Sequence, residues 1–311
     1  MPRFDVTIAG ELNLDLILYG LPEQLVPERE LLANSMMLTL GSSSAIVAHN
    51  LSALGSHAGF QSRIGDDPLG QIALERLAQG NVDVSKVRVV AGKTTTGLTM
   101  ILHHHAWRNI LTYAGTIAEL AWDDLDLDYL ADSRHFHLSS YFLQKSLQPR
   151  VPELLQFMKS RGLTVSLDTN DDPDDLWDAQ LEEVLRLVDV FLPNEREACK
   201  VAGTENLEDA ISKLSGFAPL LVVKRGREGA LAQRGMERVV SPSRQVEPVD
   251  TVGAGDSFDA GFLHQYVRGA DLAACLAWGN LAGALSTTRP GGTEAFRNVA
   301  HRENFLRESL T

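Results

Sequence analysis

A glycine-rich stretch near the C-terminal end of the chain, DTVGAGDSFDAGF at residues 250–262, combines residue types that suit phosphate chemistry. Gly253 and Gly255 let a ligand approach the backbone closely, and glycine tolerates a positive φ. Phe258, Phe262 and Tyr266 follow at helical spacing, so the stretch is predicted to be a loop that leads into a helix. Free amides and the helix dipole at such an N-terminus favour an anion.

Asp256 stands where this predicted helix begins, and two interpretations remain open for it. An aspartate at a helix N-cap is ordinary. A carboxylate beside an anion-binding loop is also where a general base would deprotonate a hydroxyl that attacks a phosphoryl group. The stretch is not a Walker A loop, because no Gly-Lys-Ser/Thr follows, and it lacks the third glycine and the position of a dinucleotide fingerprint.

The rest of the chain alternates short apolar runs with longer amphipathic segments, an order typical of buried parallel strands joined by helices. The strand-like runs are DVTIAGE, RHFHLSS, LTVSLDTN, DVFLPN and LLVVKRG. Polar residues stand at their exits: Ser139, Ser140, Asp168, Asn170, Asn194 and Lys224. Each alone could be a loop or cap residue, but ligands of open α/β sheets bind at the carboxyl ends of strands. The exits therefore predict a site at one edge of the sheet.

Two segments, at about 12–40 and 89–117, have a different pattern. TGLTMILHHHAWRNILTYAG alternates at Leu98, Met100 and Leu102 and restarts at Ile110, which predicts a hairpin that turns near HAWRN. We expect these segments to form a small β-sheet lid within a single domain of residues 1–311. Three consecutive histidines at 103–105 do not predict a metal site, because adjacent strand residues point to opposite faces.

The composition of the chain argues against several classes of function. A net charge of −13 over 311 residues argues against nucleic acid or an anionic membrane as the main partner. No apolar run approaches the roughly 18 residues of a membrane span, and the N-terminus lacks a signal-peptide pattern. Cys199 and Cys275 are far apart, which predicts two reduced thiols. We expect a cytoplasmic protein that acts on a small molecule.

The full stretch at 250–262 resembles the C-terminal signature of the ribokinase-like (PfkB-type) carbohydrate kinases. The resemblance covers nearly the whole chain, through GELNLDLI, GSSSAIVAHNLSALG, RIGDDPLG, LPNEREA, VVKRGREGA and TTRPGGTEAF. It implies an α/β, ribokinase-like fold: a Rossmann-like, mostly parallel central sheet with helices on both faces and a small β-sheet lid. The implied activity is phosphorylation, dependent on ATP and Mg²⁺, of a hydroxyl on a small unphosphorylated sugar. A nucleoside kinase of the same fold and a catalytically silent sugar- or nucleotide-binding protein remain alternatives.

The resemblance also assigns roles to residues. On the acceptor side, Asp15 would accept from sugar hydroxyls, and Gly41, Ser42, Ser43 and the lid residue Arg108 would contact substrate. On the nucleotide side, the residues are Asn194, Lys224, Gly226 and Gly229, with Glu197 near magnesium through water. Asp256 would be the base, with amides of Gly253, Ala254, Gly255 and Asp256 as the anion hole. Asp250 and TTRPGGTEAF match the segments that bind a monovalent cation such as K⁺ in relatives. A homodimer through the lid is a further expectation.

Three positions depart from the family pattern. Ser42 replaces a glycine, Ile46 replaces an asparagine, and Asp172 stands where relatives carry an arginine. Since an isoleucine cannot bind a hydroxyl, we expect an acceptor that tolerates an apolar group or a missing hydroxyl at that point. We expect Asp15 and Asp256 to face one cleft, and Asp66 could face it as well. The negative charges of these carboxylates would repel a phosphate group on the acceptor and so disfavour a phosphorylated acceptor.

Overall fold

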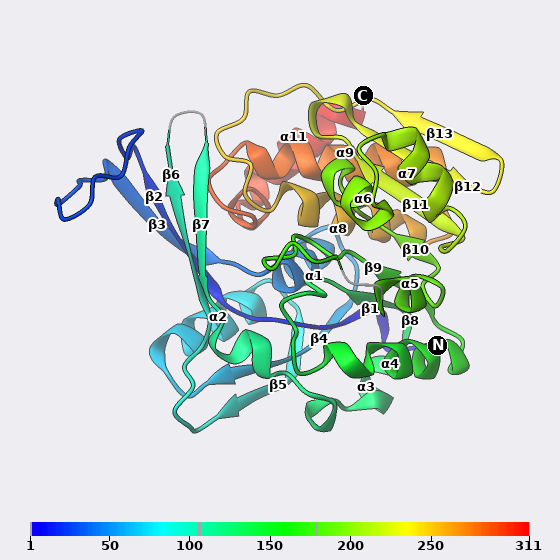
Figure 1. The fold of residues 1–311 in the computed structure, drawn as a ribbon, viewed down its shortest axis with the longest axis horizontal. Coiled ribbons are helices and arrows are strands. Elements are labelled where there is room, and N and C mark those ends of the chain that lie inside the picture. The colour runs from blue at the N-terminus through cyan, green and yellow to red at the C-terminus, as the bar shows by residue number, and fades with distance from the viewer. Residues whose placement is uncertain (1, 105–106, 178–179, 311) are drawn as a thin grey trace.

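The computed structural model describes residues 2–104, 107–177 and 180–310, which form a large sheet, a small sheet and the helices around them (Figure 1). The large sheet has the spatial order β13-β12-β11-β10-β9-β8-β1-β4-β5. Its strands are β1 Phe4–Ala9, β4 Ala58–Gly65, β5 Asp83–Val90, β8 Ser133–Leu138, β9 Thr164–Leu167, β10 Val190–Phe191, β11 Leu220–Lys224, β12 Ala230–Arg234 and β13 Glu237–Ser241. The pairs that involve β12 are antiparallel and the others are parallel.

Both faces of the large sheet are covered by helices, which confirms the predicted fold class. On β11, Leu221 and Val223 enter one apolar cluster while Leu220 and Val222 enter the other, which is why this strand reads as a continuous apolar run. The first cluster contains side chains of α3 Leu127–Ala131, α4 Val151–Ser160, α5 Gln180–Leu185, α6 Glu195–Ala202 and α7 Leu207–Leu214. The second contains those of α1 Ser43–Ala53, α2 Pro68–Gln79, α8 Ala254–Tyr266 and α9 Leu272–Thr287.

The C-terminal helices α10 Glu294–Arg297 and α11 Val299–Leu310 pack against the far end of α9, through a small cluster that includes Leu285 and Phe296. None of the described helices has the length and apolar character needed to cross a membrane.

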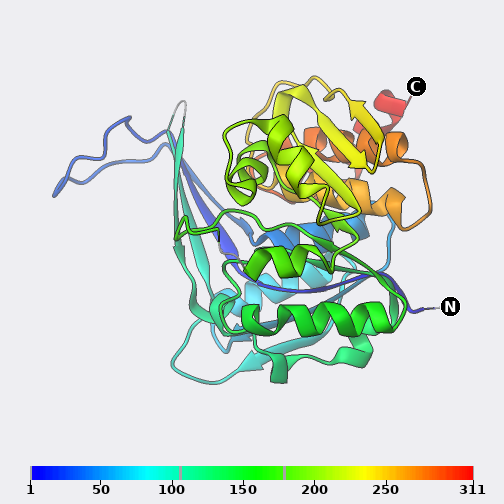
Figure 2. The same cartoon turned by 45° about the vertical axis from the view of Figure 1, so that its right-hand side comes forward.

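The small sheet stands to one side of the large one, with its four strands in the order β3-β2-β6-β7 (Figures 1 and 2). Its strands are β2 Leu14–Tyr19, β3 Ser35–Leu40, β6 Leu98–His103 and β7 Arg108–Tyr113. Antiparallel pairing of β6 with β7 forms a hairpin. The turn expected near HAWRN includes positions 105 and 106, which lie outside the described residues. The predicted restart of the alternation at Ile110 is off by one residue, because Met100 pairs with Leu111 and Ile110 pairs with Ile101.

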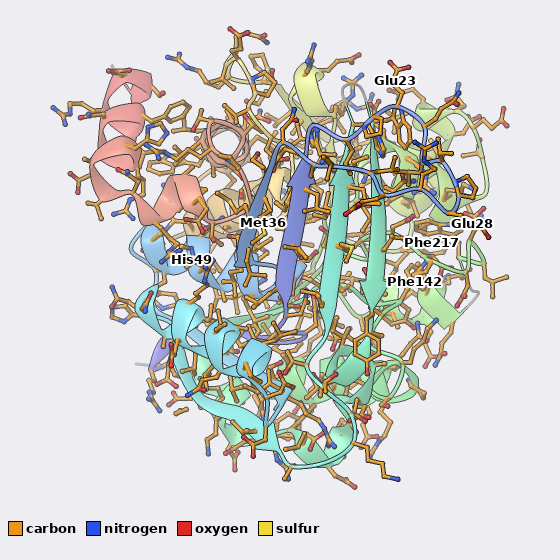
Figure 3. The ribbon with its side chains drawn as sticks, turned by 90° about the vertical axis from the view of Figure 1, so that its left-hand side faces the viewer. Glu23, Glu28, Met36, His49, Phe142 and Phe217 are labelled. Atoms are coloured by element: carbon orange, nitrogen blue, oxygen red, sulfur yellow. The ribbon has the colours of Figure 1, made fainter. Side chains whose placement is uncertain are left out.

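The two faces of the small sheet differ in character. Residues paired across strands share a face, so Asp15 lies on the same face as Thr39 and Thr99. This inner face contacts the start of the glycine-rich loop. The outer face is mostly apolar; it includes Leu16, Leu18, Met36, Leu38, Met100, Leu102 and Leu111, with Asn109 opposite Leu102. Figure 3 views this face directly, with Met36 on β3 at 67% exposure.

Candidate active site

The predicted strand exits meet at one edge of the large sheet. Strands β11, β10, β9, β8 and β1 are neighbours and run parallel, so their carboxyl ends lie side by side. A cavity of about 890 Å³ opens there. Its lining includes Arg108, Asp168, Asn170, Asn194, Glu197, Lys224, Gly226, Gly229, Gly253, Ala254, Gly255 and Asp256. Asp168, Asn170, Asn194 and Lys224 thus reach one site from successive strands, as expected for the exits of parallel strands.

The glycine-rich loop leads into α8, and its two glycines have different constraints. Gly253 is the N-cap residue with a φ of 70°, and a Cβ there would lie 2.6 Å from Cα of Gly292. A Cβ on Gly255 would meet only Nζ of Lys224, at 3.6 Å, and the rest of that side chain further off. In the first turn, Ala254 N donates to the Thr251 carbonyl at 3.3 Å. The amides of Gly255 and Asp256, which have no helical acceptor, are available to an anion.

Asp256 is buried at 8% exposure, directly after these amides. Because Gly253 occupies the N-cap position, Asp256 is not the ordinary cap residue that the sequence left open. Burial and then the charge of Asp168 raise the pKa of Asp256, whereas Lys224 and hydrogen bonds from Ser43 and Asn170 lower it. Nδ2 of Asn170 lies 3.4 Å from Oδ1 of Asp256. The side chains of Ser43 and Asn170 therefore orient this buried carboxylate, and its role as a base stays a prediction.

Asp15 lies on the inner face of β2, and its carboxylate is 5% exposed. A Cβ on Gly41 would overlap this carboxylate, so only glycine fits beside it. Burial, followed by Asp256 and Asp250, raises the pKa of Asp15 to about 7, and Arg108 opposes the rise. Asp15 and Gly41 are not part of the described cavity lining, and their contact with an acceptor stays a prediction.

Ser42 shows why relatives carry glycine at its position, because its φ is 61°. Its hydroxyl accepts from Ala45 N at 3.1 Å, as the N-cap of α1, and donates to the Glu11 carbonyl at 2.8 Å. These bonds hold the fold, and a substrate contact of Ser42 stays a prediction.

Glu11 was not among the candidate residues that the sequence predicted. Its buried carboxylate accepts from the amide and hydroxyl of Ser44 at 3.0 and 2.7 Å and from the Ser140 hydroxyl at 2.9 Å. Burial raises the pKa of Glu11 despite these hydrogen bonds. The available signal was its position as the first charged residue after β1.

The Asn-x-x-Glu motif turns out to be a capping box on α6. Oδ1 of Asn194 accepts from Glu197 N at 2.9 Å, and Oε2 of Glu197 accepts from Asn194 N at 2.8 Å. Burial and the charge of Asp168 raise the pKa of Glu197 to about 7. Among the described residues no group of three or more histidines, cysteines or acidic residues is arranged to hold a metal. One glutamate with a free oxygen at the cavity fits magnesium, which keeps several of its own waters.

Lys224 lines the cavity, but its ammonium is bound by two carboxylates. Nζ lies 2.6 Å from Oδ2 of Asp168 and 3.1 Å from Oδ2 of Asp259. Asp259 is fully buried on α8, one helical turn after Asp256, and the sequence analysis did not single it out. The signal was the Asp-Ser-Phe-Asp spacing, which places two carboxylates on one helix face.

Gly226 and Gly229, which also line the cavity, belong to the turn between β11 and β12. Gly226 and Gly229 have φ values of 55° and 92°, and a Cβ on Gly229 would overlap the Ser241 carbonyl. Both positions therefore require glycine for backbone reasons. Their contact with a nucleotide stays a prediction.

Asp250 joins the small sheet to the loops of the large one. Its carboxylate accepts from Tyr19 OH at 2.8 Å, Val252 N at 3.0 Å and Gly291 N at 3.1 Å. A second bond, from Arg108 to the Thr251 hydroxyl at 2.8 Å, makes a similar connection. A monovalent cation near Asp250 stays a prediction.

The structure places three further residues that the sequence analysis named. Ile46 is buried, and its Cδ1 lies within 3.1 Å of the Cβ positions of both Gly253 and Gly292, so it packs between two glycine loops. Asp66, which the sequence allowed at the cleft, is exposed and is absent from the described cavity lining. Asp172 is buried and accepts from the amides at 174, 176 and 177, so it closes its own loop.

The fold and the site together define an α/β kinase of the ribokinase-like class. The family model described as pfkB family carbohydrate kinase matches residues 4–298, so the chain belongs to this family and is a carbohydrate kinase. It is 33% identical to a fructokinase from Klebsiella pneumoniae over 270 residues, covering 82% of this chain and 88% of that one.

Two further relatives support the same assignment. An ATP-dependent ribose-1-phosphate kinase from Halopiger xanaduensis is 30% identical over 93% of this chain and 94% of its own. The apo structure of a candidate ribokinase II from E. coli superposes with a TM-score of 0.86 at 25% identity, covering 98% of this chain and 99% of that one.

Proposed function

We propose that the protein transfers the terminal phosphoryl group of ATP to a hydroxyl of a small unphosphorylated sugar, with Asp256 as the general base. The observation that carries this proposal is the position of Asp256. It is buried, it directly follows the free amides of the first turn of α8, and Ser43 and Asn170 orient it. ATP as the donor agrees with the name of the Halopiger relative.

Different residues would bind the acceptor, take its proton and bind the phosphoryl oxygens. Asp15 accepts hydrogen bonds from two acceptor hydroxyls and aims a third at Asp256, which takes its proton. The amides of Gly255 and Asp256 donate to the phosphoryl oxygens as charge develops on them. Asn194, Gly226 and Gly229 border the nucleotide side of the cavity. Glu197 would hold magnesium through water, and the ion would neutralise the charge of the phosphates.

The charge of the site favours a neutral acceptor. Asp15 lies near Asp256 and Asp250, and Arg108 is the cation that offsets them in the pKa of Asp15. A phosphate on the acceptor would meet these carboxylates at short range. The names of the relatives include both kinds of acceptor, a free sugar in the fructokinase and a phosphorylated one in the Halopiger kinase.

ADP release with ATP, magnesium and a panel of acceptors tests the proposal. The panel compares fructose, ribose, 2-keto-3-deoxygluconate and adenosine with fructose 6-phosphate and ribose 1-phosphate. We expect the best kcat/KM for a neutral sugar; a clear preference for adenosine would favour the nucleoside kinase, and a preference for a phosphorylated sugar would overturn this interpretation of the pocket. Binding without ADP release from any acceptor would indicate the silent protein.

Asp256→Asn identifies the base. Turnover should fall about 10²–10⁴-fold, the range for loss of a positioned base, with little change in ATP binding. Asp66→Asn is the matched control, because Asp66 is exposed and absent from the described cavity lining. Turnover of Asp256→Asn at the level of this control would remove Asp256 from the role.

Two expectations about the protein as a whole accompany the proposal. A homodimer through the small sheet is supported by its apolar outer face, which a single copy leaves in water. The mass in solution at micromolar concentration, before and after Leu16→Glu, tests it. A cytoplasmic location stays a prediction from the sequence.

A further inference from the structure

Carboxylates outnumber cations around the base. Asp168, Glu197, Asp256 and Asp259 are all buried in the same region of the structure, and the charge of Asp168 raises the pKa of each of the other three. Burial makes such like charges costly unless a cation is paired with them. The ammonium of Lys224 supplies that cation.

The ammonium group of Lys224 is enclosed by the protein and bonded to buried carboxylates. Its side chain is 10% exposed, and Nζ bonds Asp168 and Asp259. Its stem and ammonium lie below Gly255, within 4.0 Å of the position that a Cβ there would take. Its pKa is raised, chiefly because the charges of Asp168 and Asp259 outweigh the cost of burial. The ammonium is thus permanently charged, enclosed, and next to the loop that precedes the base.

A short path of hydrogen bonds connects this ammonium to Asp256. Asp168 receives the ammonium on Oδ2 and the amide of Asn170 on Oδ1, at 3.2 Å. The side chain of Asn170 then donates to Asp256 at 3.4 Å. Asn170 has a φ of 53°, a conformation that costs energy in a non-glycine residue and is held here by these bonds. Asp259 completes the arrangement from α8, the helix that carries Asp256.

We propose that Lys224, held by Asp168 and Asp259, is an internal counter-ion that keeps Asp256 ionised and oriented, and that these three are positioning residues rather than nucleotide ligands. This inference rests on the proposed role of Asp256 as the base. It replaces the sequence-based expectation that Lys224 contacts the nucleotide.

The electrostatics follow from the groups that face Asp256. These are Asp15 from β2, Asp168 after β9, Glu197 from α6, Lys224 from β11 and Asp259 from α8 itself, while Arg108 from β7 and Asp250 from the loop before α8 act on Asp15. Asp168 raises the pKa of Asp256, and Lys224 lowers it. Without the ammonium, Asp168 would be an unpaired buried carboxylate, and Asp256 would bind a proton at higher pH.

The pH profile of kcat measures this effect. At saturating acceptor and magnesium, the bound hydroxyls hold Asp15 ionised and the metal holds Glu197 ionised, so the acid limb of kcat reports the base in the ternary complex. We expect Lys224→Met to raise the apparent pKa of this acid limb of kcat by about 1–2 pH units, a shift typical of losing a close opposite charge. The double variant Lys224→Met/Asp168→Asn removes the unpaired charge, keeps an acceptor for the Asn170 amide, and should return the limb toward that of the wild type.

The control is Lys200→Met, which breaks an exposed Lys–Asp pair of similar length, 2.8 Å to Asp175, and should leave the profile unchanged. The KM for ATP should stay within about 3-fold in all these variants. A large rise in that KM in Lys224→Met, not reversed by Asp168→Asn, would overturn the proposal and restore Lys224 as a nucleotide ligand.

A second readout does not depend on turnover. In Lys224→Met the unpaired Asp168 has a raised pKa, so the loss of Tm should be larger at pH 8 than at pH 5, and Asp168→Asn should reverse it. If Tm follows this pattern while the acid limb of kcat does not move, the trio is structural only and the proposal is wrong. If Asp256→Asn retains turnover, the proposed function fails instead, whatever the Tm values show.

Discussion

Acceptor binding should depend on pH through a single carboxylate, Asp15. Burial and the charges of Asp256 and Asp250 raise its pKa to about 7 from an ordinary value of 3.8. Accepting hydrogen bonds from two sugar hydroxyls requires the ionised form, whereas a protonated carboxyl loses part of that capacity. Acceptor affinity should therefore fall as the pH drops below 7.

The size of the effect follows from the fraction of Asp15 that is ionised. If only the ionised form binds, the acceptor Kd should be about 10-fold higher at pH 6 than at pH 8 and about 100-fold higher at pH 5. Asp15→Asn should weaken binding at pH 8 and remove most of this slope. Each charged hydrogen bond lost contributes roughly 1.5–3 kcal/mol.

Calorimetric titration of the acceptor, without ATP, is the appropriate assay, because turnover also depends on Asp256. An acceptor Kd that stays flat between pH 5 and pH 8 would refute the reasoning. Asp15→Asn with the wild-type slope would assign the titration to another group.

The same group predicts a gain in stability. Because the folded-state pKa of Asp15 is raised, the folded state binds the extra proton between pH 3.8 and about 7. The associated stability is complete below pH 3.8 and is lost as the pH rises through 7. At neutral pH the ionised carboxylate thus costs up to about 4 kcal/mol, the equivalent of the 3.2 units between 3.8 and 7. Asp15→Asn should raise Tm at pH 8 and change it little at pH 4; no gain at pH 8 would contradict this account.

Further predictions concern the loop, the metal and the lid residue. Glu197→Gln, which keeps the cap acceptor, should raise the magnesium concentration for half-maximal velocity by about 10-fold while the acceptor Kd is unchanged; an unchanged magnesium requirement would make Glu197 structural. Gly253→Ala should lose about 1–2 kcal/mol or more of stability, because of its φ of 70° and the nearby Gly292, whereas Gly255→Ala should unfold near the wild-type temperature; equal losses would refute the constraint. Arg108→Gln should move the midpoint of acceptor binding to higher pH, and an unmoved midpoint would separate Arg108 from Asp15.

The sequence predicted the fold and the edge where the site lies, because short buried strands and their polar exits are local patterns. Asp168 directly follows β9, Asn194 comes three residues after the end of β10 and Lys224 ends β11, and parallel order alone brings them together. The glycine pattern around Gly253 similarly predicted the loop and the helix that follows it.

Partnerships between distant side chains could not be predicted in this way. Lys224 bonds residues 56 positions before it and 35 after it, and nothing local distinguishes this arrangement from a free lysine at the cavity. Ile46 was interpreted from what relatives carry at its position, whereas its actual neighbours are two glycine loops from the far end of the chain. The packing of loops determined both outcomes, and loop packing has no periodic signature.

The division of labour between the two sheets bears on how such an enzyme changes its substrate over evolution. Asp15 and Arg108 come from the small sheet, whereas Asp256 and Glu197 come from α8 and α6, which pack on the large one. The two parts are joined by the Tyr19–Asp250 and Arg108–Thr251 bonds. In a chimaera, residues 12–40 and 89–117 would be exchanged for those of a relative, with these two bonds preserved. We expect its acceptor preference to follow the relative, because the residues proposed for phosphoryl transfer are unchanged. New specificities can then arise by recombination of one module, without passing through inactive intermediates.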